Sequence, residues 1–418
     1  MPPSIFESYA AVRARTQALI DGLSEADCQV QSMPDASPLK WHLAHTTWFF
    51  EIFVLERFAV GFKPFDPAFR VLFNSYYQGV GEQHPRTQRG LVTRPGLRKV
   101  LAYRAAVDER MAEQLVGRAQ PGLEALVTLG LQHEQQHQEL MLTDLLHLLS
   151  CNPLAPVYRQ RPQREATDPG PAPRDGWHRL EGGLVEIGHS GSAFAFDNES
   201  PRHRQWLAPY ALARRCVSRG EWAEFRADGG YRDHRWWSSA GWDWVRREGI
   251  AAPLHERGDG RAFTLHGLLE LPADTPATHL SWYEADAFAR WWSAQHPGMA
   301  PVRLPTEGEW EHAAESLGAE ALAGGQFAED GWLHARPTEA LFGSVWQWTA
   351  SPYTPYPGFR AWEGAVGEYN AKFMVNQMVL RGGSLATPRS HLRTSYRNFF
   401  PTEARWQFSG LRLARDLG

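Results

Sequence analysis

The chain has 418 residues, of which 43% are hydrophobic and 22% are charged, and its formal net charge is −4. This composition is typical of a folded globular protein, and a chain of this length is expected to form two or three domains. The small negative charge does not favour binding to nucleic acid or to an anionic membrane. We therefore expect neither of these as a partner.

Other features of the sequence bear on the compartment in which the protein works. No run of about 18 apolar residues predicts a membrane span, and the opening MPPSIFESYAAVRART lacks the basic and apolar segments of a secretory signal. The three cysteines, Cys28, Cys151 and Cys216, are far apart and odd in number, which argues against a disulfide framework. These features predict a cytoplasmic protein.

The first 150 residues carry apolar side chains at three- and four-residue steps, which predicts helices. Ser37 and Pro38 suit the N-cap and the first position of the second helix. A four-helix bundle is the economical packing for such a segment, and we assign this domain to residues 1–157. The expected helices cover residues 3–22, 37–58, 95–117 and 121–150.

Two connections differ from the helices around them. The segment between the second and third helices, GFKPFDPAFRVLFNSYYQGVGEQHPRTQRGLVT, is long for a compact bundle, and such loops are often functional. Residues 158–179 are rich in proline, arginine and aspartate, which predicts a linker. Residues 180–418 have short apolar runs, many glycines and many turn signals. They predict an α+β domain with short strands and much irregular structure.

The stretch LQHEQQHQE in the last predicted helix contains His133 and His137, which lie on one helix face and can chelate one ion. Two unpartnered imidazoles would be costly to bury in so apolar a helix, which favours a role as metal ligands. A third histidine is needed, and the second helix offers His42 and His45 in KWHLAHTTWF. Three imidazoles leave coordination positions open, as a catalytic metal requires.

The same stretch also matches H-E-x-x-H, the pattern of zinc proteases. The longer form of that pattern fails, because His137 is followed by Gln-Glu-Leu-Met-Leu, although a separate downstream glutamate ligand is not excluded. We expect peptide hydrolysis to be absent. Glu134 and Glu139 are expected to be exposed or to lie behind the ligands, and neither is predicted to bind the metal.

Two motifs, PLKWHLAH and HEQQHQE, in a helical, DinB-like half resemble those of the EgtB-type sulfoxide synthases of ergothioneine biosynthesis. The second half resembles the formylglycine-generating-enzyme-type domain, which has a C-type-lectin-like fold. The two resemblances cover nearly the whole chain, and together they imply a DinB-like four-helix bundle followed by that domain. The matching stretches of the second half are FDNESPRHR (196–204), VSRGEWAEF (217–225), LSWYEADAFARWW (280–292), RLPTEGEWEHAA (303–314), FGSVWQWTASPY (342–353), RGGS (381–384) and GLRLARD (410–416).

Formylglycine generation is an alternative activity for such a domain, and it uses a pair of cysteines near the C-terminus to bind copper. Residues 217–418 contain no cysteine. We therefore expect the domain to serve as a scaffold for other chemistry.

The resemblance implies a mononuclear non-haem Fe(2+) centre with His45, His133 and His137 as ligands, and His42 as a packing residue or one that lies behind a ligand. The implied reaction joins a thiol to C2 of the imidazole of hercynine (Nα-trimethylhistidine), with O2 as oxidant and a sulfoxide as product. Binding both substrates to one metal would hold sulfur and carbon in reacting geometry. The expected small-molecule partners are hercynine, cysteine and O2.

In this family an active-site tyrosine donates a proton and suppresses oxidation of the thiol to a sulfinate. The long loop carries Tyr76 and Tyr77, a pair that resembles the cysteine-using subgroup, and the sequence does not choose between them. For the thiol substrate, Arg86 and Arg89 are candidate carboxylate partners. Asp35 is a candidate ammonium partner, and Arg86 with Asp35 is the preferred pair.

For hercynine, the resemblance implies Gln136 and the pair Asn398–Phe399, since an aromatic face attracts a quaternary ammonium. Phe400 stands where γ-glutamylcysteine users have an aspartate, which favours cysteine. Three alternatives remain. They are γ-glutamylcysteine as the thiol, a histidine-accepting ovothiol-type synthase and a non-enzymatic lectin-like binding module. Ovothiol-type enzymes usually carry a further methyltransferase domain, and we expect none here because the sequence ends at Gly418.

Overall fold

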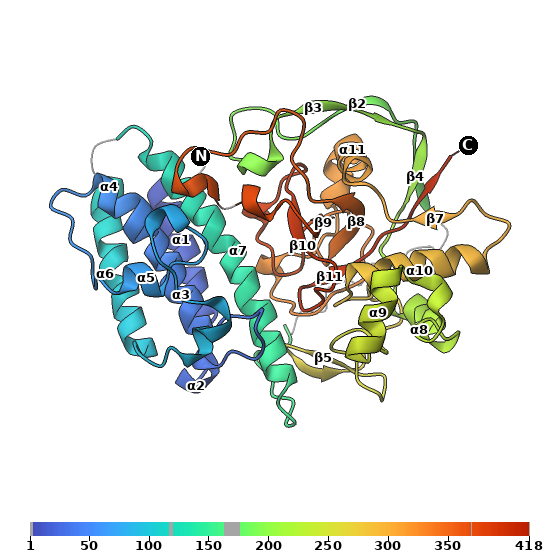
Figure 1. Cartoon of the computed structure of the whole chain (residues 1–418), viewed down its shortest axis with the longest axis horizontal. Helices are drawn as coiled ribbons and strands as arrows, with labels where there is room; N and C mark the ends of the chain where they lie inside the picture. The colour runs from blue at the N-terminus through green and yellow to red at the C-terminus, as the bar shows by residue number, and fades with distance from the viewer. Residues whose placement is uncertain (1–2, 117–119, 163–175, 369, 418) are drawn as a thin grey trace. The chain divides into compact units, whose positions relative to one another are not determined.

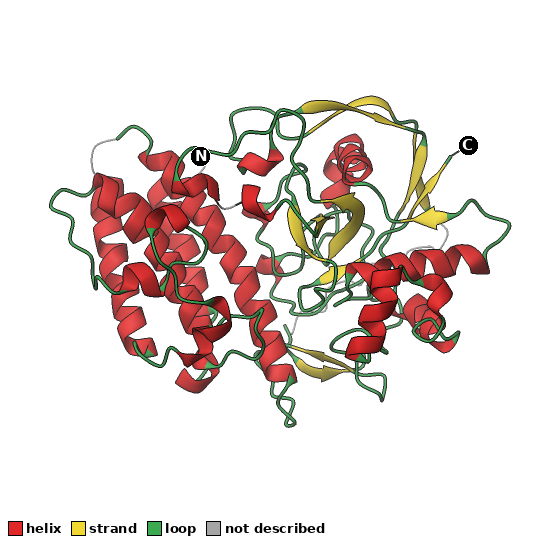
Figure 2. Ribbon diagram, viewed as in Figure 1, coloured by secondary structure: helices red, strands yellow, loops and turns green. Residues whose placement is uncertain are grey.

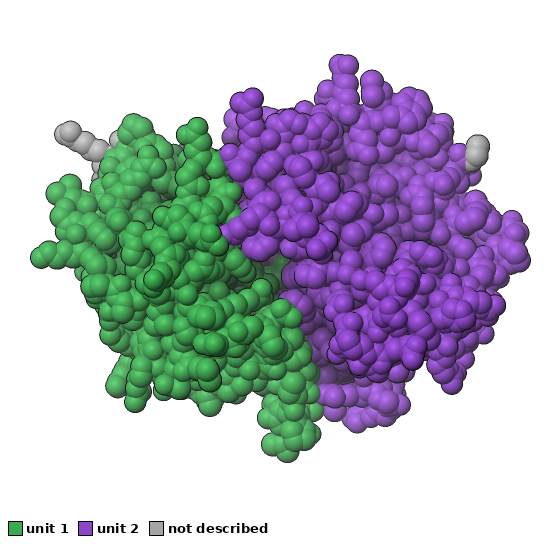
Figure 3. All heavy atoms as spheres, viewed as in Figure 1, with its two compact units in different colours: residues 1–158, 362–369 green, residues 159–361, 370–418 purple. Residues whose placement is uncertain are grey.

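The computed structural model describes residues 3–116, 120–162, 176–368 and 370–417. It divides into two compact units, one of Met1–Tyr158 with Trp362–Tyr369 and one of Arg159–Ala361 with Asn370–Gly418 (Figure 3). The first unit is helical, and the named strands all belong to the second (Figure 2). The predicted fold class, a helical domain followed by an irregular α+β domain, is confirmed. The exact domain boundaries stay a prediction, and most of the expected linker lies outside the described residues.

Four long helices form the body of the first unit, as the periodicity predicted. The α1 helix packs on α7, while α3 packs on both α6 and α7, so that the four lie side by side (Figure 1). Ser4 and Glu7 form a capping box at the start of α1, which satisfies two backbone groups that the first turn leaves open. The four helices are α1 (Ile5–Ala18), α3 (Leu39–Phe49), α6 (Leu97–Val116) and α7 (Leu123–Ser150).

The start of α3 differs from the prediction. Pro38 takes the N-cap position, so the assignment of Ser37 as N-cap is wrong. The Ser37 backbone N–H instead donates to Asp144 Oδ2 at 2.8 Å, and its hydroxyl accepts a hydrogen bond from Arg89. These tertiary partners satisfy Ser37 in place of the helix end. Beyond Phe49 the helix continues through the π-helical turn η1 (Phe50–Leu55) into α4 (Glu56–Phe58), and such turns are frequent at functional sites.

The long loop after α4 is held by short helical turns and by a distant segment of the chain. It contains α5 (Phe69–Leu72), η2 (Gln78–Val80) and η3 (Arg86–Leu91), and α2 (Glu25–Gln29) is a further short helix before α3. The carboxylate of Glu368, from η8 (Ala365–Glu368), accepts the backbone N–H groups of Gln78 and Gly79 at 2.8 Å. The tyrosine-bearing loop is therefore tied to a segment almost 300 positions later in the sequence.

Two four-stranded sheets form the framework of the second unit, in the orders β1-β4-β12-β7 and β10-β9-β8-β11, with the two-stranded pairs β2-β3 and β5-β6 beside them. The strands are β1 (Trp177–Leu180), β2 (Gly183–Ile187), β3 (His203–Leu207), β4 (Tyr210–Ala213), β5 (Ala262–Thr264), β6 (Gly267–Leu269), β7 (Val302–Arg303), β8 (Trp346–Pro352), β9 (Gln377–Arg381), β10 (Asn398–Pro401), β11 (Ser409–Gly410) and β12 (Ala414–Asp416). The helices are α8 (Arg219–Ala227), α9 (Ser239–Glu248), α10 (Trp282–Gln295) and α11 (Glu307–Leu317), with short turns η4 (Asp197–Glu199), η5 (His234–Trp236), η6 (Gly318–Leu322), η7 (Ala328–Asp330), η9 (Ala371–Phe373) and η10 (Arg389–His391).

Buried ion pairs position α11 against the second sheet. Arg381 on β9 pairs with Glu311, and Arg397, directly before β10, pairs with Glu307 at 2.9 Å. Such pairs must be fully hydrogen-bonded to offset the loss of solvation, and Arg397 also donates to two backbone carbonyls. Strand β10 is thereby fixed beside β9. Among the described residues, no helix is long and apolar enough to cross a membrane.

Candidate metal centre

Three buried imidazoles meet inside the first unit. His133 and His137 stand one turn apart on α7, and His45 comes from α3. The Nε2 atom of His133 lies 3.2 Å from His45 Nε2 and 3.1 Å from His137 Nε2. Within the described part of the chain, this is the only group of three or more histidine, cysteine or acidic residues able to share one metal ion. The predicted grouping of His45 with the two helix histidines is therefore observed.

The environment keeps these imidazoles neutral, which a metal ligand must be. Burial lowers the pKa of His45 and His137 well below the usual range, and neighbouring imidazoles lower both further. Burial also lowers the pKa of His133 to about 3. The His45 Nδ1–H group donates to the Phe73 carbonyl at 2.7 Å, which leaves the Nε2 atom, 3.2 Å from His133 Nε2, with a free lone pair. The three residues fit a divalent ion of the kind that imidazole prefers, such as iron, zinc, copper or nickel.

Aromatic side chains enclose the centre. Trp41 and Trp48 both stack on His45, at centroid distances of 4.6 and 5.6 Å, and Phe49 packs against His133 at 4.9 Å. All three come from α3 and are buried. They hold the imidazole planes in place and limit the access of water.

His42 lies behind His137. This agrees with the expectation that it stands behind a ligand. Its Nδ1 is 2.8 Å from His137 Nδ1, and its Nε2 is 3.1 Å from Asp144 Oδ2. Asp144 was not among the residues predicted from the sequence. Its position at i+7 from His137 puts it on the same face of α7, and that spacing was the available signal.

Tyr76 and Tyr77 lie in the loop that Glu368 holds. The Tyr77 side chain is buried against Trp48, Phe49 and Phe53, and burial raises the pKa of Tyr77 above its usual range. Tyr76 is half-buried. Asn74 donates to the Tyr77 carbonyl and accepts from the Tyr77 backbone N–H, so it fixes the turn between them.

Arg89 is an unusual cation because only 3% of its surface is exposed. Its guanidinium lies 3.3 Å from the centroid of Trp41 and donates to the hydroxyls of Ser37 and Ser75 at 2.9 Å each. Its Nε has no hydrogen-bond partner, and no carboxylate of the described residues lies within ion-pair distance. Burial lowers the pKa of Arg89 to about 9. The side chain is therefore a buried donor suited to an anionic group.

The other predicted substrate residues of the first unit are more exposed. Arg86 and Asp35 are both exposed, and the Arg86 guanidinium donates to the Asp35 backbone carbonyl and not to its carboxylate. Gln136 is half-buried on α7, directly before His137.

Asn398, Phe399 and Phe400 belong to the second unit, on β10. Phe399 stacks on Tyr353 at 4.0 Å with the two planes 9° apart, and Phe400 meets the edge of Trp406 at 5.6 Å. The Asn398 side-chain oxygen accepts the Phe399 backbone N–H. All three residues are half-buried, so each keeps some accessible surface.

Glu134 is fully buried, so the expectation of an exposed carboxylate is wrong. The other expectation, a residue that lies behind the ligands, is the one that is left. It pairs with Arg13 from α1 at 3.0 Å and with Arg104 from α6. Burial raises the pKa of Glu134, but the two guanidinium groups outweigh it and bring the pKa to about 2. A carboxylate held in this way is not available as the general base of a zinc protease.

Glu134→Gln is expected to destabilise the first unit by roughly 3–5 kcal/mol, because it removes the counter-charge of the buried Arg104 and one of the two carboxylates that pair with Arg13, the other being Asp108. Thermal unfolding monitored by circular dichroism measures this. Since the folded pKa is below that of the unfolded chain, the stabilisation is complete above pH 4.5 and is lost as the pH falls towards 2. The exposed Glu124→Gln on the same helix is the control, with an expected change within about 0.5 kcal/mol. Equal stability of both variants would contradict the structural role of Glu134.

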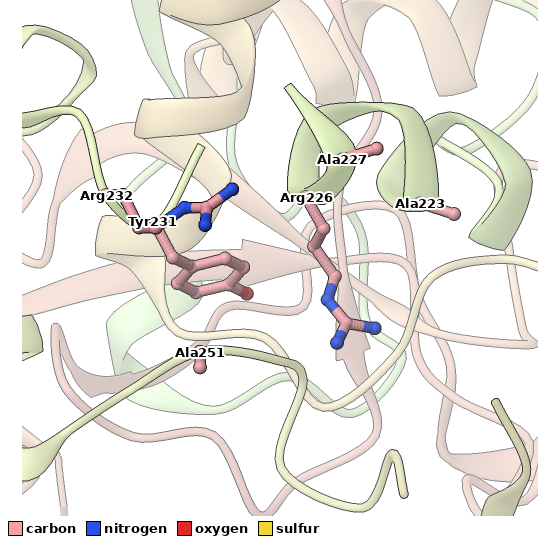
Figure 4. Close-up of a pocket in the computed structure, with 6 residues that line it drawn as sticks. All are labelled: Ala223, Arg226, Ala227, Tyr231, Arg232 and Ala251. Atoms are coloured by element: carbon pink, nitrogen blue, oxygen red, sulfur yellow. The ribbon is translucent and has the colours of Figure 1, made fainter. Parts of the chain in front are cut away.

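An open hollow in the second unit is separate from these residues. Figure 4 shows the Arg226 and Arg232 side chains near Tyr231. Arg226 pairs with Glu256 at 3.2 Å, and the Tyr231 hydroxyl donates to Glu284 at 2.6 Å. None of the predicted site residues is among those that line it, which are Ala223, Arg226, Ala227, Tyr231, Arg232 and Ala251.

Known protein families match both halves of the chain. The DinB superfamily matches residues 8–141, and the sulfatase-modifying factor enzyme 1-like domain matches residues 165–340 and 338–417. A formylglycine-generating enzyme of Streptomyces coelicolor is 29% identical over 249 residues, which cover 46% of this chain and 74% of the relative. These matches define a two-domain class in which a DinB-type domain precedes a sulfatase-modifying-factor-type domain.

Relatives that match the full length identify the family. The hercynine oxygenase of Mycobacterium tuberculosis is 32% identical over 444 residues, which cover 100% of this chain and 99% of the relative. The hercynine oxygenase of Mycolicibacterium thermoresistibile is 32% identical and covers 97% of this chain and 93% of its own length. The chain belongs to the hercynine oxygenase family and is an oxidoreductase. The resemblance inferred from the motifs is confirmed at the level of the family, and the thiol subgroup stays a prediction.

Proposed function

We propose that this protein is an iron(II)-dependent hercynine oxygenase that joins the sulfur of cysteine to C2 of the hercynine imidazole, with O2 as oxidant and hercynylcysteine sulfoxide as product. The observation that carries the proposal is the buried triad of His45, His133 and His137 in a chain of this family. Fe(2+) in the triad would supply the reduction of O2 and would hold both substrates. The other steps fall to side chains around it.

Arg89 is proposed to bind the carboxylate of cysteine. Support comes from its burial, its unpartnered Nε and its stacking on Trp41, which itself stacks on His45. A carboxylate in this position would provide the counter-charge that the guanidinium lacks. Arg86 and Asp35 remain the second candidate pair, with Asp35 for the ammonium group.

Gln136 and the pair Asn398–Phe399 are proposed to bind hercynine. Gln136 is adjacent to His137 on α7, and its amide can hydrogen-bond an imidazole nitrogen. The trimethylammonium group has no hydrogen to donate, so an aromatic face such as Phe399 suits it. The stack with Tyr353 fixes the plane of that ring.

Cysteine is proposed as the thiol for two reasons. Phe400 offers no charge to the α-ammonium group of the longer γ-glutamyl substrate, and the Tyr76–Tyr77 pair resembles that of the cysteine-using subgroup. One of these two hydroxyls would donate the proton that directs the reaction to the sulfoxide and away from the sulfinate.

Protein loaded with Fe(II) under anaerobic conditions and then supplied with O2 and hercynine is expected to turn over cysteine faster than γ-glutamylcysteine. Initial rates from chromatography with mass detection resolve the two sulfoxides. Faster turnover of γ-glutamylcysteine would overturn the choice of thiol and leave the reaction class intact. Turnover of histidine in place of hercynine would point to an ovothiol-type reaction, and the absence of any coupled product would overturn the proposal.

The matched variants Arg89→Met and Arg86→Met decide between the two carboxylate candidates in the same assay. Arg89→Met is expected to raise the KM for cysteine while the KM for hercynine stays near the wild-type value. A larger effect of Arg86→Met would favour the exposed Arg86–Asp35 pair.

A further inference from the structure

A continuous hydrogen-bonded chain leads away from the metal centre through His137. Asp144 Oδ2 lies 3.1 Å from His42 Nε2, and His42 Nδ1 lies 2.8 Å from His137 Nδ1. His137 Nε2, on the other side of the ring, lies 3.1 Å from His133 Nε2 in the triad. The three residues of the chain are at most 4% exposed, so water does not substitute for these contacts.

The positions of the protons follow from this geometry. A metal bound at His137 Nε2 requires the lone pair there, so the proton of that imidazole must be on Nδ1. His137 Nδ1–H then donates to His42 Nδ1, which must accept, and the His42 proton is therefore on Nε2 and is donated to Asp144. Every donor in the chain meets an acceptor in one consistent direction.

Asp144 is itself fixed by a contact outside this chain. Its Oδ2 also accepts the backbone N–H of Ser37, at 2.8 Å, just before α3 begins. The carboxylate therefore bridges α7, which carries His137, and the start of the helix that carries His45 and His42.

We propose that His42 and Asp144 are positioning residues that orient His137 and strengthen its bond to the metal, an inference that rests on the metal centre of the proposed function. A carboxylate behind a ligating histidine fixes its tautomer and raises its basicity. In this chain the effect is transmitted through a second histidine. His45 differs, because its Nδ1–H donates to the neutral Phe73 carbonyl. His137 is thus the one of these two ligands that is linked to a negative charge.

The test measures metal affinity without turnover. Metal-free protein is titrated with Co(II), a spectroscopic probe for Fe(II), and the affinity is read from the visible absorption bands. His42→Phe is expected to weaken Co(II) binding by about 10- to 100-fold and to shift those bands. His42→Asn is expected to be intermediate, because its Oδ1 replaces the Nδ1 acceptor but nothing replaces the bond to Asp144. Glu124→Gln, at an exposed position of the same helix, is the control, and its Co(II) affinity should equal that of the wild type.

Thermal unfolding of metal-free and Co(II)-loaded protein separates positioning from a structural role. His42→Asn is expected to lower the unfolding temperature of the Co(II)-loaded protein more than that of the metal-free protein. If both His42→Asn and His42→Phe bind Co(II) as tightly as the wild type, the positioning role of His42 is overturned. If His42→Phe does not fold, the affinity of His42→Asn alone decides. Failure of the wild type to bind Co(II) would instead count against the proposed function, so the two failures are distinguishable.

Discussion

His137→Gln is expected to remove metal binding and to lower sulfoxide formation by at least about 1,000-fold, because a bound metal contributes several kcal/mol to such a reaction and each 1.4 kcal/mol is a factor of ten. Glutamine is close to histidine in size, so the substitution removes the ligand nitrogen without leaving a large cavity. Its amide does not replace the aromatic lone pair that His137 presents to His45 and His133. The measurements are iron content by atomic emission and product formation under O2.

The same loss is expected for His45→Gln and His133→Gln, because each would leave two protein ligands in place of three. The control is Glu124→Gln, which changes an exposed side chain of the same helix α7. Near-normal iron content in any of the three ligand variants would remove that histidine from the proposed ligand set.

Local periodicity was sufficient to predict the four long helices and two of the three clustered histidines. The apolar spacing of α7 and the four-residue step between His133 and His137 are properties of one segment, so they can be read without tertiary information. The choice between His42 and His45 is different, because both lie on α3. The resemblance favoured His45, and in the structure His45 faces the other imidazoles while His42 stands behind His137.

Contacts between distant segments explain what the sequence did not predict. Glu134 pairs with Arg13 and Arg104, which belong to two other helices. The residues near Glu134 in the sequence therefore do not predict its burial. Ser37 has the residue type of an N-cap, yet its hydrogen bonds in the structure are to Asp144 and Arg89. In both cases polar side chains lie inside the protein because several elements contribute to one hydrogen-bonded network.

The burial of Arg89, a predicted substrate residue, also depends on contacts between distant segments. An arginine in a polar loop is most often exposed, and Arg86, in the same loop, is indeed exposed. Arg89 is buried because Trp41 and two serine hydroxyls surround its guanidinium. Only the three-dimensional contacts distinguish Arg89 from Arg86. The variants Arg89→Met and Arg86→Met test this difference through the KM for cysteine.

Tyr77→Phe is expected to lower the ratio of sulfoxide to cysteine sulfinate by at least about 100-fold, since a positioned proton donor contributes about that factor or more. We expect Tyr77 to be this donor because its ring packs against Trp48 and Phe49, which in turn contact His45 and His133. Burial raises the pKa of the Tyr77 hydroxyl, so the group is protonated at neutral pH and can serve as a proton donor. The two products are separated by chromatography and quantified in the same reaction.

Tyr76→Phe is the matched control, because it removes the neighbouring hydroxyl from the same loop and leaves the aromatic rings around the triad in place. Its product ratio is expected to stay within about threefold of the wild type, a difference of less than 1 kcal/mol. A larger shift for Tyr76→Phe than for Tyr77→Phe would reverse the assignment. Unchanged ratios in both variants would remove the loop tyrosines from the proton transfer, and the choice between sulfoxide and sulfinate would then depend on how the two substrates are held.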